Sequence, residues 1–306
     1  MLHSRSNDFL IMSAKRAALT ALSVWAGLVL VCVVLAFAFS GTQWGLPPAD
    51  SSGTKNWAVD DWREDQSETL RRGSFIREPE NTWSNSAYLL AGLLVLFRAR
   101  KPLPFAFGGQ LCALSLTSGL YHASVLEPWQ TLDIAGVYGA LISLLAFCID
   151  SMAKGFLGLP GRPVLVWSLV PATAGLALLM ACLRTKFILF DSTIGFVIIV
   201  GVLLVLIVIT FVVTHRRPGR HVDFIHGCGV VFDHVWVVTG FLLLAAGVGL
   251  LCRLGDGAGR FLSAPGSWLQ AHAVWHVLSA AALLLTYELF ARVAGDDQRV
   301  FCDADR

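Results

Sequence analysis

The sequence predicts an all-α polytopic membrane protein, with a core of seven transmembrane helices and one additional N-terminal transmembrane helix. Of the 306 residues, 56% are hydrophobic and only 14% are charged, whereas a soluble domain carries about 25% charged residues. The mean hydropathy is +0.66. Eight apolar stretches are long enough, or nearly so, to cross about 30 Å of hydrocarbon as helices. These observations exclude soluble enzymes, nucleic-acid-binding proteins and disordered proteins.

The eight stretches follow one another along the chain and differ mainly in length. They cover residues 17–39, 83–98, 104–125, 130–152, 164–183, 192–213, 229–252 and 268–291. The second is short for a full crossing, so its helix can begin before residue 83. The first could be a signal peptide cleaved after Ala36-Phe-Ala38. Its apolar run exceeds the roughly 7–15 residues usual for such a segment, and we interpret it as a membrane anchor.

These stretches divide the chain into four parts. Residues 1–40 form the N-terminal tail and the extra helix, 41–81 an acidic outer loop, 82–292 the seven-helix domain, and 293–306 a cytoplasmic tail. Most of the 23 Lys and Arg residues fall on one side if both termini are cytoplasmic, as the positive-inside rule requires. This pattern suits a bacterial inner membrane, and an internal membrane of a eukaryote is the alternative.

Five polar side chains are expected at one depth, near the outer end of the helices. His122 lies near the end of the third stretch, while His272 and His276 begin the last one, a helical turn apart and therefore on one face. Ser118 precedes His122 by the same spacing, and Asp133 opens the fourth stretch. Because ionisable groups inside a membrane are costly and usually functional, this group is the candidate site.

These residue types are those of a catalytic zinc site. Three neutral imidazoles and one open position are typical of such sites, where zinc makes a bound water acidic enough to supply hydroxide near neutral pH. Because Ala273 stands where an HExxH motif has its Glu, the base must come from another helix, and Asp133 is the candidate. Ser118 could hold the water or an oxyanion. The alternative is that the three histidines only form interhelical hydrogen bonds.

Other potential ligands in the chain are interpreted without a metal. His226, Asp233 and His234 lie near the inner start of the seventh stretch, beside a basic loop. We interpret them as a polar cluster that contacts anionic lipid headgroups. The seven cysteines contain no CxxC pair, so they predict neither a disulfide framework nor a cysteine metal site.

The five polar residues resemble the CREST superfamily of seven-helix membrane hydrolases, which includes alkaline ceramidases and adiponectin-receptor-like proteins. The segment Glu78-Pro-Glu-Asn-Thr-Trp-Ser-Asn85 is similar to the E-x-x-N-T-x-S-N segment of alkaline ceramidases. The resemblance spans about residues 60–290, the whole core. It implies the roles of several residues: zinc ligands at His122, His272 and His276, a catalytic aspartate at Asp133 and a site serine at Ser118.

The resemblance also implies a calcium site in the acidic loop. Its ligands would be Asp61, the backbone carbonyl of Trp62, Glu64, Gln66 and Glu78. Carboxylates and neutral oxygens suit this hard cation. Gln66 stands where the family usually has Asn, and the stretch between the two halves of the site is about three residues longer than in the family. The alternative is a solvated acidic loop, with Glu78 favoured by a nearby helix N-terminus.

These observations lead to an expected function. We expect a zinc-dependent intramembrane amidase that cleaves ceramide or a related N-acyl lipid to a fatty acid and a long-chain amine. Its cofactors would be Zn²⁺ and Ca²⁺, its partner the lipid substrate, and neither a nucleic acid nor an obligate protein partner is expected. One alternative is an adiponectin-receptor-like lipid sensor with the same zinc site. Another is a transporter, against which the absence of interrupted helices in matched halves argues.

Overall fold

The computed structural model describes residues 14–40, 74–157, 163–183, 192–215, 235–256, 261–262, 267 and 269–293. Within these ranges the chain is helical, as predicted, and it forms no strand. The helices are α1 (Ala14–Ala38), α2 (Pro79–Ser84), α3 (Ser86–Leu96), α4 (Pro102–Ser124), α5 (Glu127–Leu157), α6 (Pro163–Leu183), α7 (Ser192–His215), α8 (Val235–Gly255) and α9 (Ala271–Val293).

The lengths and apolar composition of these helices are those of a membrane protein. Four candidate spans lie in α1, α4, α5 and α9: Arg16–Ala38, Pro102–Ser124, Pro128–Lys154 and Ala271–Ala291. Shorter apolar helical segments are described in α6, α7 and α8. The total of seven core helices, the status of α1 as an extra helix and the orientation in the membrane stay predictions.

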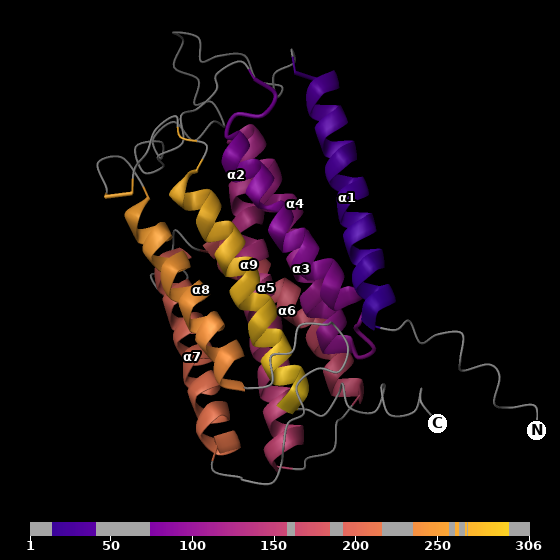
Figure 1. Ribbon diagram of the computed structural model, residues 1–306, viewed down its shortest axis with the longest axis vertical. Helices are drawn as coiled ribbons and strands as arrows, with labels where there is room; N and C mark the ends of the chain where they lie inside the picture. The colour runs from indigo at the N-terminus through magenta and orange to yellow at the C-terminus, as the bar shows by residue number, and fades with distance from the viewer. Residues whose placement is uncertain are drawn as a thin grey trace, which may run out of the picture.

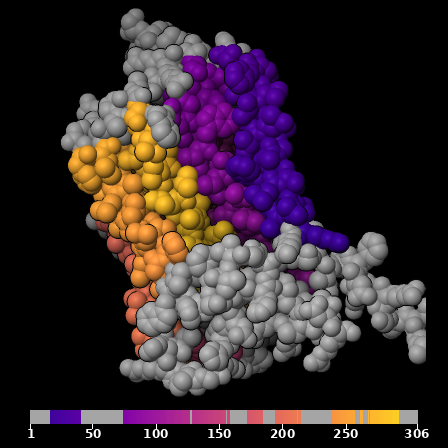
Figure 2. All heavy atoms as spheres, viewed as in Figure 1, coloured from indigo at the N-terminus to yellow at the C-terminus, as the bar shows by residue number. Residues whose placement is uncertain are grey.

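Helix α5 lies at the centre of the bundle. It packs against α4, α6, α7 and α9, and α9 crosses in front of it in Figure 1. Helix α1 stands at one edge, beside the purple helices in Figure 2, and it contacts α3. There the indole Nε1 of Trp25 donates a hydrogen bond of 2.9 Å to the carbonyl of Ser86. Much of the rest of α1 is exposed and apolar, including Leu19 and Leu30, as expected of a helix that faces lipid.

The second predicted stretch begins earlier than residue 83 and is broken. Pro79 starts α2, as is common because proline lacks the N–H that the first turn would leave unpaired. The chain turns at Asn85 before α3 begins. At this break the Asn85 carbonyl accepts a hydrogen bond of 2.7 Å from the hydroxyl of Ser115 on α4. The same carbonyl also accepts from the N–H of Tyr88 at 3.1 Å, so it joins the first turn of α3 to α4.

Helix α3 is fixed to its neighbours by one close packing contact and one ion pair. A Cβ atom at Gly92 would lie 2.8 Å from the carbonyl oxygen of Gly108, so α3 and α4 approach too closely there for a larger residue. Small residues allow such approaches between membrane helices. Just after α3, the guanidinium of Arg98 donates to both carboxylate oxygens of Glu288 on α9. These contacts hold α3 against α4 and α9.

We expect a methyl group at Gly108 to destabilise the bundle. A Cβ atom there would lie 2.9 Å from the Leu96 side chain and 3.0 Å from the carbonyl of Gly92. Gly108→Ala should therefore lower the free energy of unfolding by roughly 1–3 kcal/mol, as overpacking does in other proteins. Gly109→Ala is the matched control, because a Cβ atom at that neighbouring position meets nothing within 4 Å. Thermal unfolding of the two variants in detergent measures the difference. Equal melting temperatures would show that the close approach of α3 to α4 does not exclude a methyl group at residue 108.

Candidate metal centre

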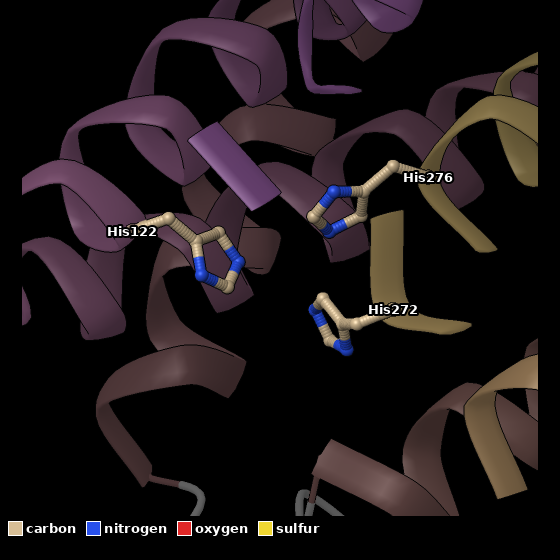
Figure 3. Close-up of side chains that lie close together, drawn as sticks. All are labelled: His122, His272 and His276. Atoms are coloured by element: carbon tan, nitrogen blue, oxygen red, sulfur yellow. The ribbon is translucent and has the colours of Figure 1, made fainter. Parts of the chain in front are cut away.

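Three buried histidines from two helices meet at one end of the bundle. His122 belongs to the last turn of α4, and His272 and His276 to the first turns of α9. Their rings face one another across a shared space in Figure 3. They are 1%, 6% and 2% exposed, and one ring nitrogen from each lies within 4.8 Å of the other two. The predicted convergence of the three histidines is confirmed, and one metal ion could contact all three.

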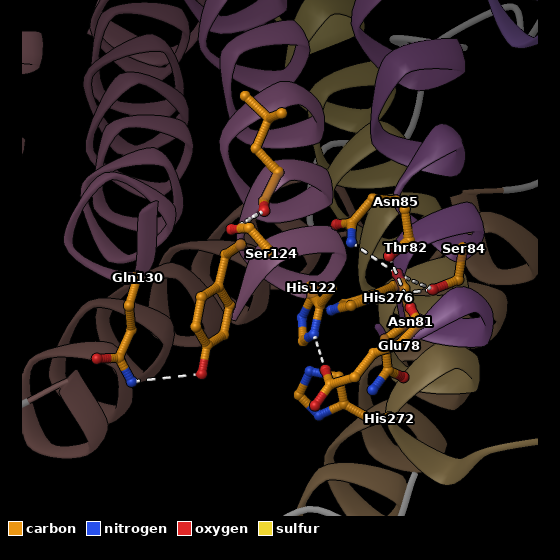
Figure 4. Close-up of polar contacts among 12 residues, drawn as sticks. Glu78, Asn81, Thr82, Ser84, Asn85, His122, Ser124, Gln130, His272 and His276 are labelled. Atoms are coloured by element: carbon orange, nitrogen blue, oxygen red, sulfur yellow. Dashed lines mark hydrogen bonds and ion pairs between the residues drawn. The ribbon is translucent and has the colours of Figure 1, made fainter. Parts of the chain in front are cut away.

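The ring of His122 is held by the carboxylate of Glu78. Nδ1 of His122 lies 2.6 Å from Oε2 of Glu78, and both side chains are buried (Figure 4). An ionised carboxylate can only accept, so a neutral imidazole that bonds to it carries its hydrogen on Nδ1. The lone pair is then on Nε2, where a metal ion could bind it.

Glu78 is itself fixed by the end of α4 and the start of α2. Its backbone N–H donates to the carbonyl of His122 at 3.1 Å, and the N–H of Arg77 donates to that of Ala123 at 3.0 Å. These carbonyls belong to the last turn of α4, whose carbonyl groups have no partner within the helix. The hydroxyl of Thr82 donates to the Glu78 carbonyl at 2.6 Å. Glu78 thus contacts His122 through both its backbone and its side chain.

The ring of His276 is held from the other end of α2. Nδ1 of His276 lies 2.8 Å from the hydroxyl oxygen of Ser84. That hydroxyl donates its hydrogen to the carbonyl of Asn81 at 2.9 Å (Figure 4). Because the hydroxyl has a single hydrogen, its oxygen accepts from His276, which again leaves Nε2 with the lone pair. The segment 78–84 therefore reaches both histidine-bearing helices.

The ring of His272 lies against a third oxygen. Oδ2 of Asp256, just beyond α8, is 3.2 Å from Nδ1 of His272. The two atoms form an ion-pair contact whose alignment is poorer than that of a hydrogen bond. Asp256 is fully buried. All three imidazoles consequently have an oxygen at Nδ1.

Asp133 and Ser118 lie together beside these rings. Ser118 and His122 both lie close enough to the carboxylate of Asp133 to interact with it electrostatically. Ser118 is 2% exposed and lies one turn before His122 on α4. Asp133 comes from the start of α5. The five side chains that the sequence predicts at one depth are thus neighbours in the structure.

The donor set fits a zinc ion. Metal-bound histidines usually donate their second ring N–H to a carboxylate, a carbonyl or another oxygen, which orients the ring and raises its basicity. Glu78, Ser84 and Asp256 provide such oxygens here. Three imidazole nitrogens with room for a further ligand are typical of catalytic zinc sites. The carboxylate of Asp133 lies next to this set.

The sequence does not predict two of the oxygen-bearing residues at the site, Ser84 and Asp256. Asp256 does follow a predicted span, at the end of the bundle where the site lies. Glu78, which the sequence predicts among the calcium ligands, contacts His122. The other expected calcium ligands lie outside the described residues: Asp61, Trp62, Glu64 and Gln66. His226, Asp233 and His234 also lie outside them, so the calcium site and the inner polar cluster stay predictions.

The family-model comparison identifies the chain. A model described as Ceramidase matches residues 67–299. The chain belongs to the ceramidase family. No curated protein and no solved structure matched it. The matched range contains the three histidines, Ser118, Asp133 and the three oxygen-bearing residues that hold the rings. Membership in the ceramidase family implies a hydrolase that acts on the amide bond of a lipid in a membrane.

Proposed function

We propose that this ceramidase family member is a zinc-dependent intramembrane amidase. It would cleave ceramide or a related N-acyl lipid to a fatty acid and a long-chain amine. The observation that carries the proposal is the convergence of three buried imidazoles beside Ser118 and Asp133. The contacts of the rings through Nδ1 support a metal ion on the Nε2 side.

The chain's own residues have distinct tasks in this proposal. A zinc ion held by His122, His272 and His276 would polarise the amide carbonyl and make a water molecule more acidic. Asp133 accepts a proton from the attacking water and passes it to the nitrogen of the departing amine. Ser118 would orient the Asp133 carboxylate, beside which it lies, and would stabilise an oxyanion.

The atoms of the reaction balance with water as the only co-reactant. The oxygen of water bonds to the acyl carbon, and the carbon–nitrogen bond breaks. The proton that Asp133 received moves to the amine nitrogen, so the products are a fatty acid and a long-chain amine. The proton transfer is essential because an amine leaves poorly as an anion. Burial of the site excludes the bulk water that would compete for these hydrogen bonds.

The membrane placement of the site follows from the charge pattern and stays part of this proposal. The three histidines lie where α4 ends and α9 begins. If both termini are cytoplasmic, as the Lys and Arg residues favour, this end of the bundle is in the outer leaflet. The amide of a bilayer lipid lies near the headgroup boundary. This end of the helices would therefore meet the scissile bond at its natural depth.

The direct test is fatty acid release from a labelled N-acyl lipid by the purified full-length protein. We expect N-acyl sphingosine to be hydrolysed, the activity to disappear after treatment with a zinc chelator, and added Zn²⁺ to restore it. Release that is insensitive to chelation would contradict zinc dependence. A zinc-loaded protein that releases no fatty acid from any N-acyl lipid tested would favour the lipid-sensor alternative.

Asp133→Asn separates the proton acceptor from the ligands. The substitution should lower kcat by about 10²- to 10⁴-fold, as expected for loss of a general base, while bound zinc is retained. His276→Ala should instead lower the zinc content, measured by elemental analysis, together with turnover. Asp150→Asn is a control on the same helix, because Asp150 pairs with Lys154 near the other end of α5. Full activity in Asp133→Asn would refute its assigned role.

A further inference from the structure

Asp256 is a buried carboxylate that the mechanism above does not use. It lies directly after α8, and its residue is 0% exposed. Taking an ionised carboxylate out of water is expensive unless a partner compensates for the lost hydration. Nδ1 of His272, at 3.2 Å from Oδ2, is such a partner. The buried carboxylate of Asp256, whose dehydration costs free energy, thus lies against a candidate metal ligand.

The end of α8 builds this position. The N–H of Asp256 donates to the Cys252 carbonyl at 3.0 Å, which continues the last helical turn. The carbonyl of Gly255 accepts from the N–H of Leu262 at 3.0 Å. A Cβ atom at Gly255 would lie 2.7 Å from both the Leu262 and the Phe261 side chains, so the chain returns very closely here. Because α8 packs along α9, this geometry directs Asp256 towards the helix that carries His272.

The contact repeats the arrangement at His122. There a buried carboxylate from a connecting segment, Glu78, meets Nδ1 of an imidazole on the neighbouring helix. Asp256 lies against the same atom of His272, at the longer distance of 3.2 Å. These two carboxylates add negative charge beside the candidate ligands, where a cation would be poorly hydrated. This charge also opposes the positive charge of Arg253, which acts on His272.

We infer that Asp256 is a positioning residue of the metal centre, which orients His272 and supplies part of the charge that retains the metal ion. This inference rests on the proposed zinc-dependent function. It makes Asp256 a determinant of metal affinity rather than a group that contacts the substrate. The competing explanation is that Asp256 only stabilises the turn between α8 and α9. That explanation predicts an effect on folding and none on zinc binding.

The test measures the zinc dissociation constant of the full-length protein in detergent by competition with a chelating dye. Asp256→Asn keeps the shape and an acceptor oxygen but removes the charge, and we expect zinc affinity to fall about 10- to 100-fold. The visible spectrum of the Co²⁺-substituted variant should also change, because a neutral amide polarises the His272 ring less than a carboxylate and makes it a weaker ligand. Asp150→Asn, the same substitution at an ion-paired site on α5, should leave both readouts unchanged.

The outcomes separate this inference from the proposed function. If Asp256→Asn binds zinc as tightly as the wild type and gives the same Co²⁺ spectrum, the inference is overturned, whatever the stability of the variant. If the wild-type protein binds no zinc, the proposed function fails and the inference fails with it. Asp256→Ala is expected to show the larger loss of affinity. Should that variant not fold, the isosteric Asn variant decides alone.

Discussion

The contact between each buried imidazole and an oxygen atom at its Nδ1 is the interaction on which the candidate site depends. Glu78, Ser84 and Asp256 provide these oxygens for His122, His276 and His272. The hydrogen bonds at His122 and His276 favour the ring hydrogen on Nδ1 and so direct Nε2 to a shared ligand position, and Asp256 places a carboxylate at the same atom of His272. Without them the same three rings would be ordinary buried polar groups in need of partners.

The fold can be understood as the support for these contacts. The short segment 78–84 lies between the two helices that carry the histidines, since α2 contacts both α4 and α9. It reaches His122 at one end and His276 at the other. The close approach of α3 to α4 at Gly92 and the pairing of Arg98 with Glu288 on α9 hold the same helices further along the bundle. Loss of one of these helix contacts can therefore displace the histidine rings at the end of the bundle.

The sequence predicted the helices and the histidines because these depend on short-range patterns. Long apolar runs identify spans, and the spacing of His272 and His276 places both on one face. The contacts of Glu78, Ser84 and Asp256 could not be predicted in the same way. These residues lie at the edges of helices, and their partners depend on how the connecting segments pack across the bundle. Glu78 shows the difference most clearly, since sequence resemblance suggested calcium and the structure places it against His122.

X-ray absorption at the zinc edge of the purified protein tests the central claim most directly. Three imidazoles that bind through Nε2 should give about three nitrogen neighbours near 2.0–2.1 Å, with one further oxygen at a similar distance. The multiple scattering typical of imidazole should correspond to three rings. Sulfur neighbours at about 2.3 Å, or a shell that contains fewer than three imidazoles, would contradict the assignment of His122, His272 and His276 as the ligands.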